Sequence, residues 1–315
     1  MKALLVEATA PASSANLGAG FDVFSVALDV LFDSVSVEVV RRSGIEITVE
    51  GTEAHLVPVE PDKNTAGVVA KALLDLSHKK CGLVIRINKG VRPGRGLGSS
   101  AASAAAAALA INEALGLGLS KRELITFAAQ GEIASAGFPH ADNVSASVLG
   151  FFTIVRSYKP LEVIQLPLPK NIEFVVALPE IIKSTASMRS VLPKHVELSD
   201  VVHNVGHATT FIAGIALNDV NLMGKGMADS IVEPARARMF PGIIDVKLSA
   251  LEAGAAGVAI SGAGPSVLAL VKAEKETIES VAKAMKDTFE KKGVKGQIIR
   301  AKPGPGAKVV RREKL

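Results

Sequence analysis

The chain has 315 residues, of which 48% are hydrophobic, and a formal net charge of +5 at pH 7. This length can support a large core and suggests two domains, while the single cysteine, Cys81, excludes an intramolecular disulfide and a multi-cysteine metal site. The sequence has no run of about 20 strongly apolar residues and no apolar signal segment at its start, so we expect a cytoplasmic protein.

The positive charge is concentrated at the end of the chain. Residues 302–315 contain five basic residues and one acidic residue, which gives +4 of the total of +5. The remainder is therefore close to neutral, and a single tyrosine and no tryptophan leave no basic stripe interleaved with aromatic residues. We expect no nucleic-acid partner and no membrane partner, and we interpret the tail as a solvated end.

Apolar patterns predict a mixture of strands and helices. Residues 35–39 and 45–49 alternate with period two around Ser43 and Gly44, which predicts a hairpin of half-buried strands. Further strands are predicted at 83–87, 148–155, 162–166, 173–178, 257–260, 267–271 and 296–301. Helices are predicted at 66–76, 99–115, 121–135 (with Ser120 as N-cap), 200–217, 241–253 and 274–292.

The run Leu166-Pro167-Leu168-Pro169 interrupts these patterns and indicates a domain boundary. We therefore expect an N-terminal domain over 1–168 and a C-terminal domain over 169–315. Neither half alternates strands and helices strictly, so the predicted fold class is α+β rather than a doubly wound sheet.

The strongest chemical signal is a glycine-rich segment between a predicted strand and a predicted helix. After Pro93 it reads Gly94-Arg95-Gly96-Leu97-Gly98-Ser99-Ser100-Ala101-Ala102. Glycines let backbone amides approach an anion without a Cβ in the way, and the free N–H groups and dipole of a helix start favour phosphate. The segment therefore predicts a phosphate-binding loop.

Other glycine motifs fit this segment less well. A dinucleotide fingerprint requires G-x-G-x-x-G, whereas these glycines run G-x-G-x-G. A Walker loop requires G-K-[ST], and a nucleophile elbow requires G-x-S-x-G, where this chain has an alanine at the last position. A purely structural glycine turn remains open for the segment taken alone.

Two more glycine-bearing motifs flank this one. Residues 11–22 read PASSANLGAGFD, and residues 261–266 read SGAGPS. Three such motifs, in this order along nearly the whole chain, resemble the GHMP kinases. Mevalonate and galactose enzymes of that superfamily carry a lysine or arginine early in the first motif, whereas PASSANLGAGFD is similar to the homoserine kinase family. The same resemblance extends to Thr185 and to residues 137–143 (GFPHADN), 189–193 (RSVLP), 233–236 (EPAR) and 306–309 (GAKV).

The resemblance implies a two-domain GHMP kinase fold. The N-terminal nucleotide-binding domain would contain a left-handed β-α-β unit, and the C-terminal domain would be ferredoxin-like, with substrate between them. ATP and Mg²⁺ would be the cofactors. The reaction would transfer the γ-phosphate of ATP to L-homoserine, giving O-phospho-L-homoserine for threonine biosynthesis, and family habit suggests a homodimer.

The resemblance also assigns residues to the nucleotide and the metal. Ser100 and Glu132 would bind Mg²⁺, which prefers oxygen ligands and takes few from the protein. The expected nucleotide-binding residues come from the second and third motifs: Pro93, Gly94, Arg95, Gly96, Leu97, Gly98, Ser99, Ser100, Ala101, Ala102, Ser261, Gly262, Ala263 and Gly264. Taken alone, Ser100 could be a helix cap and Glu132 a residue on a solvated helix face.

For the amino-acid substrate, the resemblance assigns Asp22 to the ammonium group and both Arg189 and Arg236 to the carboxylate. These pairings suit the chemistry, since a carboxylate balances an ammonium and a forked guanidinium matches a carboxylate. The remaining pocket residues would be Asn16, His140, Asn143 and Thr185. The catalytic set would be Asn143, Arg189, Ser100 and Glu132.

Asn143 stands where mevalonate and galactose kinases offer an aspartate to the attacking hydroxyl. An asparagine cannot accept a proton at neutral pH, and phosphoryl transfer depends mainly on alignment and charge neutralisation. We therefore predict in-line transfer without a side-chain base, with Asp142 as the alternative base. Two other functions stay open: a kinase for a different small alcohol, and a ligand-sensing relative without activity.

Overall fold

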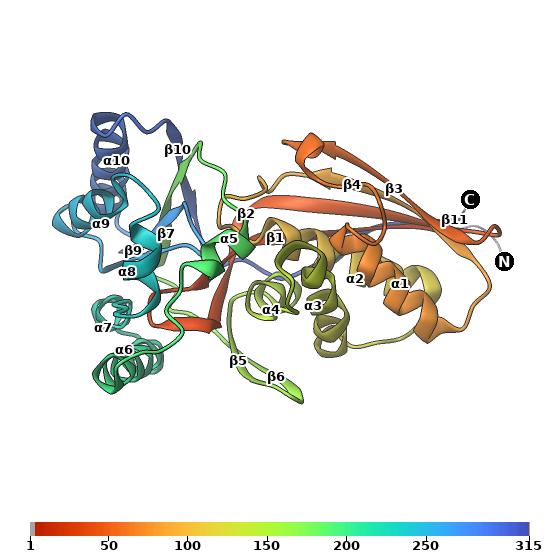
Figure 1. Cartoon of the computed structure of the whole chain (residues 1–315), viewed down its shortest axis with the longest axis horizontal. Helices are drawn as coiled ribbons and strands as arrows, with labels where there is room; N and C mark the ends of the chain where they lie inside the picture. The colour runs from red at the N-terminus through yellow and green to blue at the C-terminus, as the bar shows by residue number, and fades with distance from the viewer. Residues whose placement is uncertain (1–3, 315) are drawn as a thin grey trace.

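Two β-sheets organise the computed structural model, which describes residues 4–314. A seven-stranded sheet has the order β11-β1-β2-β4-β3, and β5 and β6 extend it from β2; a four-stranded sheet has the order β10-β7-β9-β8. Helices pack against both sheets, which confirms the predicted α+β class (Figure 1). The strands of the larger sheet are β1 (Leu4–Asn16), β2 (Gly20–Val40), β3 (Gly44–Gly51), β4 (Gly82–Lys89), β5 (Phe152–Tyr158), β6 (Leu161–Leu166) and β11 (Lys308–Lys314).

The predicted hairpin of residues 35–39 and 45–49 is wrong. Both segments are strands, but β4 lies between them, antiparallel to β2 and parallel to β3, so that Ile85 stands opposite both Val37 and Ile47. The period-two pattern identified two half-buried strands without identifying their partners. The chain passes from β3 through α1 (Thr65–Ser77) into β4, which makes a parallel β-α-β unit in the N-terminal half.

The core of the N-terminal half is built around α2 (Ser99–Leu115), whose predicted bounds are confirmed. Its alanines are fully buried, because small side chains allow the sheet, α1, α3 (Lys121–Ala136) and α4 (Asp142–Leu149) to pack on it from several sides. Ser120 caps α3, as predicted, and it also forms a reciprocal capping box with Glu123. The strand predicted at 148–155 begins too early, because residues 148–149 still belong to α4 and β5 starts at Phe152.

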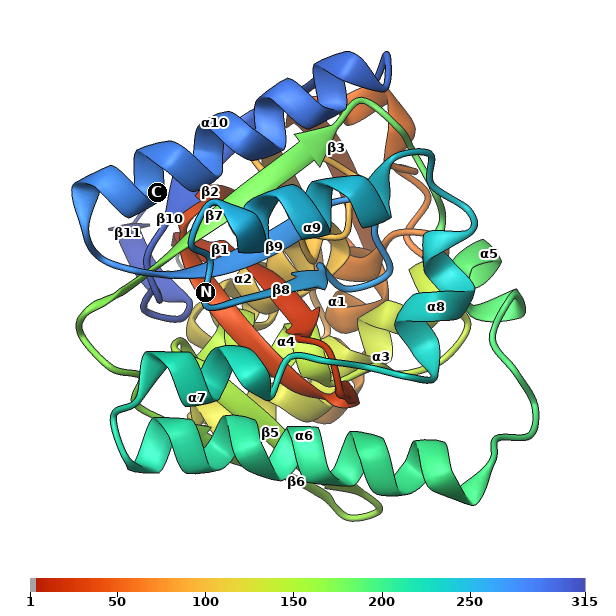
Figure 2. The same cartoon turned by 90° about the vertical axis from the view of Figure 1, so that its left-hand side faces the viewer.

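The second sheet is antiparallel, and its order together with the sequence β7-α-β8-β9-α10-β10 is the ferredoxin-like arrangement that the resemblance implies. Figure 2 shows α9 and α10 along one side of this sheet and α6 and α7 along the other. The strands are β7 (Ile172–Pro179), β8 (Gly257–Ile260), β9 (Val267–Lys272) and β10 (Gly296–Ala301). The helices are α5 (Thr185–Ser190), α6 (Leu198–Ala216), α7 (Val220–Lys225), α8 (Val232–Ala237), α9 (Ile243–Glu252) and α10 (Lys275–Lys291).

The two faces of β7 belong to different cores. Val175 and Ala177 pack with residues of α9 and α10, whereas Phe174 on the opposite face belongs to a core that also contains Phe24 and Phe152 of the larger sheet. The rings of Phe24 and Phe152 lie 5.2 Å apart edge to face. This shared core fixes the two halves against each other and so fixes the site between them.

The end of the chain is not a loose solvated tail. Residues 308–314 form β11, which pairs antiparallel with β1 so that Lys314 stands opposite Leu4 at the sheet edge (Figure 1). Its lysine and arginine side chains stay mostly exposed, and charged residues of this kind discourage further strand pairing at an edge. Among the helices of residues 4–314, none has the length and apolarity to cross a membrane.

Candidate active site

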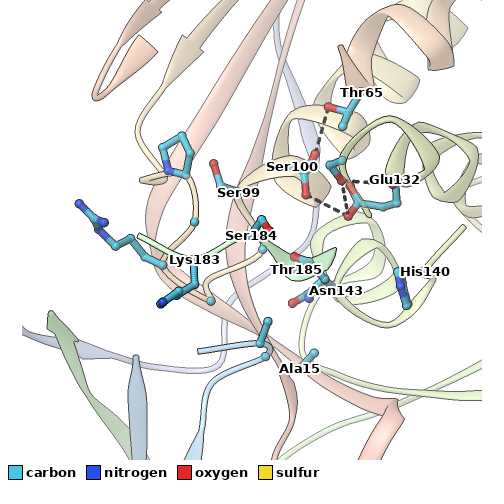
Figure 3. A pocket seen from close by; sticks show the side chains of 18 of the residues that line it. Ala15, Thr65, Ser99, Ser100, Glu132, His140, Asn143, Lys183, Ser184 and Thr185 are labelled. Carbon is cyan, nitrogen blue, oxygen red and sulfur yellow. Dashed lines mark hydrogen bonds between the residues drawn. The ribbon is translucent and has the colours of Figure 1, made fainter. Parts of the chain in front are cut away.

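The three glycine-bearing motifs meet at one cavity of about 470 Å³ between the two halves of the chain. Figure 3 shows side chains from both halves around it, among them Ser100 and Glu132 of the N-terminal half and Ser184 and Thr185 of the C-terminal half. The predicted residues that line it are Asn16, Asp22, Pro93, Gly94, Arg95, Gly96, Gly98, Ser99, Ser100, Glu132, His140, Asn143, Thr185, Arg189, Arg236, Gly262, Ala263 and Gly264. Four other predicted residues, Leu97, Ala101, Ala102 and Ser261, are buried behind the lining.

Glycines make this convergence possible. Gly96 and Gly98 both have positive φ, at 78° and 64°, which is a strained conformation for any residue with a side chain. A Cβ at Gly96 would collide with the backbone of Ser261, and one at Gly98 would collide with the Ser13 hydroxyl of the first motif. The glycine-rich loop therefore touches the first and third motifs directly and ends at the N-terminus of α2, where free amides favour a phosphate.

Ser100 and Glu132 form an oxygen-rich pair in the cavity wall. The Ser100 Oγ donates to Glu132 Oε2 at 2.9 Å, and the second carboxylate oxygen, Oε1, is buried with no partner within residues 4–314 (Figure 3). Burial raises the pKa of Glu132 to about 7. Glu132 is thus not on a solvated face. An unpartnered buried carboxylate oxygen beside a hydroxyl fits a divalent cation such as Mg²⁺.

Asp22 and Arg189 form an ion pair across the cavity. The guanidinium binds the carboxylate with both of its ends, with Nη2–Oδ2 at 2.6 Å and Nη1–Oδ1 at 3.3 Å. This contact joins the first motif to α5 of the C-terminal half and raises the pKa of Arg189. His140 contacts both members of the pair, with its Nδ1 3.8 Å from Asp22 Oδ1 and its Nε2 3.3 Å from Arg189 Nη1, and burial lowers the pKa of His140.

Arg236 is a buried cation without an acidic partner. Only 3% of the residue is exposed, and its Nη1 donates to the carbonyl of Gly262 at 2.8 Å. Within residues 4–314 no carboxylate lies within ion-pair distance of its guanidinium. Arg236 and Arg189 both stack on the ring of Phe21, at 5.3 and 5.4 Å from its centre. The two arginines therefore present a pocket with two positive charges, of which Asp22 neutralises one.

Asn143 is held in a defined orientation at the start of α4. Its Oδ1 accepts a hydrogen bond from the Ser13 Oγ at 3.0 Å, and its amide nitrogen has no hydrogen-bond partner within residues 4–314. The neighbouring Asp142 is 5% exposed, and its Oδ1 accepts from the backbone N–H of Asn143 at 2.8 Å. Burial, aided by the negative charge of Asp22, raises the pKa of Asp142 to about 7.

The cavity also contains residues that sequence reasoning missed. Lys89 and Ser103 line it behind the glycine-rich loop, and Phe21 supports the two arginines. Leu56, Val57 and Pro58, at and just after the short 3₁₀ helix Ala54–Leu56, also line the cavity, as does Asn64. The position of Lys89 could have pointed to it, because a lysine at the end of a predicted strand precedes the glycine-rich segment by a few residues.

Family models match both halves of the chain. The model described as "GHMP kinases N terminal domain" matches residues 64–151, and the model described as "GHMP kinases C terminal" matches residues 211–291. The chain therefore belongs to the GHMP kinases, a class of small-molecule kinases, as its fold and its three motifs predict.

Comparison with individual proteins identifies a narrower family within the GHMP kinases. A homoserine kinase of Methanococcus vannielii is 43% identical over 285 residues, covering 90% of this chain and 93% of the relative. One of Natronomonas pharaonis is 44% identical over 305 residues, covering 97% of this chain and 100% of the relative. The crystal structure of a homoserine kinase from Cytophaga hutchinsonii superposes with a TM-score of 0.92 at 37% identity, covering 97% of each chain. Within the GHMP kinases, the chain is a member of the homoserine kinase family.

Proposed function

We propose that this protein transfers the γ-phosphate of ATP to the hydroxyl of L-homoserine, giving O-phospho-L-homoserine and ADP in the route to threonine. The observation that carries the substrate assignment is the charge of the pocket. Arg236 is buried without a carboxylate partner, and it shares the ring of Phe21 with Arg189. A buried cation of this kind calls for an anionic ligand, and the carboxylate of an amino acid matches two adjacent guanidinium groups.

The remaining pocket residues support a zwitterionic substrate. Asp22 can take the ammonium group, and its present partner, Arg189, can turn to the carboxylate together with Arg236. Asn16 is fixed by donating its Nδ2 to the Gly262 carbonyl at 2.8 Å, which joins the first and third motifs at the floor of this pocket. A neutral alcohol such as a sugar would leave Arg236 without a counter-charge, because Asp22 pairs only with Arg189.

The nucleotide assignment is supported by the glycine-rich loop and the start of α2. ATP would place its phosphates against the loop amides and its base near the apolar residues around Ala54–Leu56. Ser100 and Glu132 would hold Mg²⁺, which neutralises phosphate charge when bound. Thr185 lines the cavity from the C-terminal half, and its hydroxyl would contact the transferred phosphate (Figure 3).

In the proposed reaction the homoserine oxygen attacks the γ-phosphorus, the bond from that phosphorus to the β-bridging oxygen breaks, and the hydroxyl proton leaves to phosphate or water. Asn143 orients the attacking hydroxyl. Its amide nitrogen, which has no partner within residues 4–314, would donate the hydrogen bond, and an asparagine is not a base at neutral pH. Alignment supplies much of the rate in such transfers. Asp142 stays the alternative base, because its raised pKa suits proton transfer near pH 7.

An ADP-release assay with ATP and Mg²⁺ tests the function. L-homoserine should give saturable turnover, while mevalonate, shikimate, L-serine and L-threonine should give little. Turnover with another of these alcohols would keep the kinase and reject the amino-acid pocket. Binding of ATP without turnover on any of them would favour a ligand-sensing relative.

We also propose that the protein forms a homodimer through α6. This helix of 19 residues has Asp200 as its one charged side chain, yet Leu198, Val202 and Val205 are 75%, 66% and 57% exposed. These three residues lie on one helix face, and Gly206 near the middle has open space around it. Two copies of such an uncharged face can meet around a two-fold axis without like-charge repulsion.

Sedimentation velocity at micromolar concentrations tests the dimer. Val202→Glu should dissociate it, because the substitution places a carboxylate in the centre of the apolar face. Val310→Glu is the matched control, since Val310 is 48% exposed on β11 at the edge of the other sheet. A wild-type protein that sediments as a monomer would refute the proposal, and so would a Val202→Glu variant that remains dimeric.

A further inference from the structure

Asp33 and Lys89 form a buried ion pair directly behind the glycine-rich loop, and none of the roles above uses it. Their side chains are 0% and 2% exposed. Asp33 lies in β2, Lys89 is the last residue of β4, and the two are adjacent because these strands pair. Burying two charges is costly, so this pair calls for an explanation.

The hydrogen bonds of this pair are saturated. The Lys89 ammonium donates to Asp33 Oδ2, to the Ser99 carbonyl at 2.9 Å and to the Ser103 Oγ at 2.9 Å, which uses all of its protons. Asp33 Oδ1 accepts from the backbone N–H groups of Gly90 and Val91, both at 3.0 Å. Its Oδ2 accepts from Lys89 and from the Ser103 Oγ, the latter at 2.7 Å.

These partners lie at the two ends of the glycine-rich loop. Gly90 and Val91 lead into it from β4, while Ser99 and Ser103 follow it in the first turns of α2. A further bond closes the base of the loop, from the Ser99 Oγ to the Val91 carbonyl at 2.7 Å. The buried pair thus forms hydrogen bonds at both ends of the segment 92–98. The glycines of this segment have the backbone freedom to adopt other conformations.

A lysine beside a glycine-rich loop could instead be a direct phosphate ligand, like the lysine of a Walker loop. The geometry opposes this role here, because each N–H of the Lys89 ammonium already has an acceptor and almost none of its side chain is exposed. A phosphate contact would require Lys89 to leave Asp33 in a buried site.

We propose that Asp33 and Lys89 are positioning residues that clamp both ends of the glycine-rich loop and so preorganise its amides for the nucleotide phosphates. The inference rests on the proposed nucleotide site. It adds that the phosphate affinity of the loop depends on an ion pair that touches no ligand.

Nucleotide binding without turnover separates the two roles of Lys89. We would measure the affinity for AMPPCP, a non-hydrolysable ATP analogue, by calorimetry. Asp33→Asn should weaken binding at least about tenfold, because the bonds to both loop ends weaken together. If Lys89 were a phosphate ligand, the same change would free its ammonium and leave AMPPCP affinity unchanged or raised, which would overturn the proposal.

A milder variant avoids an unpaired buried charge, which can prevent folding. Ser103→Ala removes one bond to each partner of the pair and should weaken AMPPCP binding about fivefold, with homoserine affinity unchanged. Ser249→Ala is the control, since the Ser249 Oγ donates to the Val246 carbonyl in α9, away from the loop. An AMPPCP affinity equal to that of the control would contradict the clamp.

Hydrogen exchange of the protein without nucleotide tests the clamp separately from the proposed function. Amides of residues 92–98 should exchange faster in Ser103→Ala than in the wild type, while those of β7 should not change. Unchanged exchange in the loop would reject the clamp even if the enzyme phosphorylates homoserine. Faster exchange in a protein that does not bind AMPPCP would retain the clamp and reject the proposed nucleotide site.

Discussion

Replacing Arg236 by methionine provides the sharpest test of the amino-acid pocket, because binding and stability should change in different ways. The free protein holds this guanidinium at 3% exposure with a carbonyl partner and no acidic one within residues 4–314. Methionine keeps a long side chain against Phe21 and removes the charge. The Gly262 carbonyl keeps its bond from Asn16, and the substitution otherwise removes only the long 3.5 Å bond from Arg236 Nε to the Met188 carbonyl.

The expected loss concerns homoserine. A hydrogen bond to a charged group contributes about 1.5–3 kcal/mol, so losing the Arg236 contact to the substrate carboxylate should cost about 3 kcal/mol. That corresponds to a KM for homoserine roughly 150-fold higher, with a smaller change in kcat because the carboxylate is not at the reacting end. The melting temperature should not fall, since removing an unpaired buried charge relieves the folded state of a cost.

Steady-state kinetics with homoserine, calorimetry with AMPPCP and thermal melting measure these three quantities. Arg238→Met is the matched control, because Arg238 follows two residues later, at the end of α8, and is exposed. The control should leave the KM for homoserine unchanged. The reasoning would be refuted by a KM within threefold of wild type for Arg236→Met, or by an equal loss of AMPPCP affinity.

Three further outcomes follow from the same geometry. Glu132→Gln should lower turnover at least about 100-fold and abolish the Mg²⁺ dependence of AMPPCP binding. Titration of Mg²⁺ measures this dependence, and an undiminished dependence would contradict the metal role of Glu132. Folding raises the pKa of Asp142 from 3.8 to about 7, so ionisation favours the unfolded chain. The wild type should therefore lose up to roughly 4 kcal/mol of stability through this group as pH rises from about 4 through 7. Asp142→Asn should lose less over the same pH range, as measured by urea melts. If that variant also lost turnover while homoserine still bound, Asp142 would be the base. Ser120→Ala should cost about 1 kcal/mol in urea melts with kcat unchanged, because it removes only the cap of α3.

The features that sequence predicted best are those with local signals. The bounds of α2 were correct because glycines with positive φ, Gly98 and Gly116, stand on both sides of an alanine-rich run. Likewise, Ser120 and Glu123 mark the start of α3 within four residues. The resemblance in the motifs assigned residues as distant as Asn16 and Gly262, and most of the assigned residues line the cavity, whereas Leu97, Ala101, Ala102 and Ser261 do not.

The features that sequence could not predict depend on partners far along the chain. A period-two pattern shows which side chains of β3 face inward, but the strand beside it, β4, arrives only after α1. The same holds for charges: Asp33 pairs with Lys89, 56 residues later, and Asp22 pairs with Arg189, 167 residues later. Asp22 stands out because it ends the first glycine-bearing motif, but nothing near Asp33 in the sequence distinguishes it from a surface carboxylate.

Charge at the amino-acid pocket explains why a zwitterion suits it better than a neutral alcohol. In the free protein, Asp22 neutralises Arg189 while Arg236 stays alone. A bound homoserine would add one positive and one negative charge, leaving the net charge unchanged and giving every cation an adjacent anion. The ammonium would face Asp22 and the carboxylate would lie between the two arginines. A ligand with only an ammonium that took Asp22 would leave both arginines unpaired.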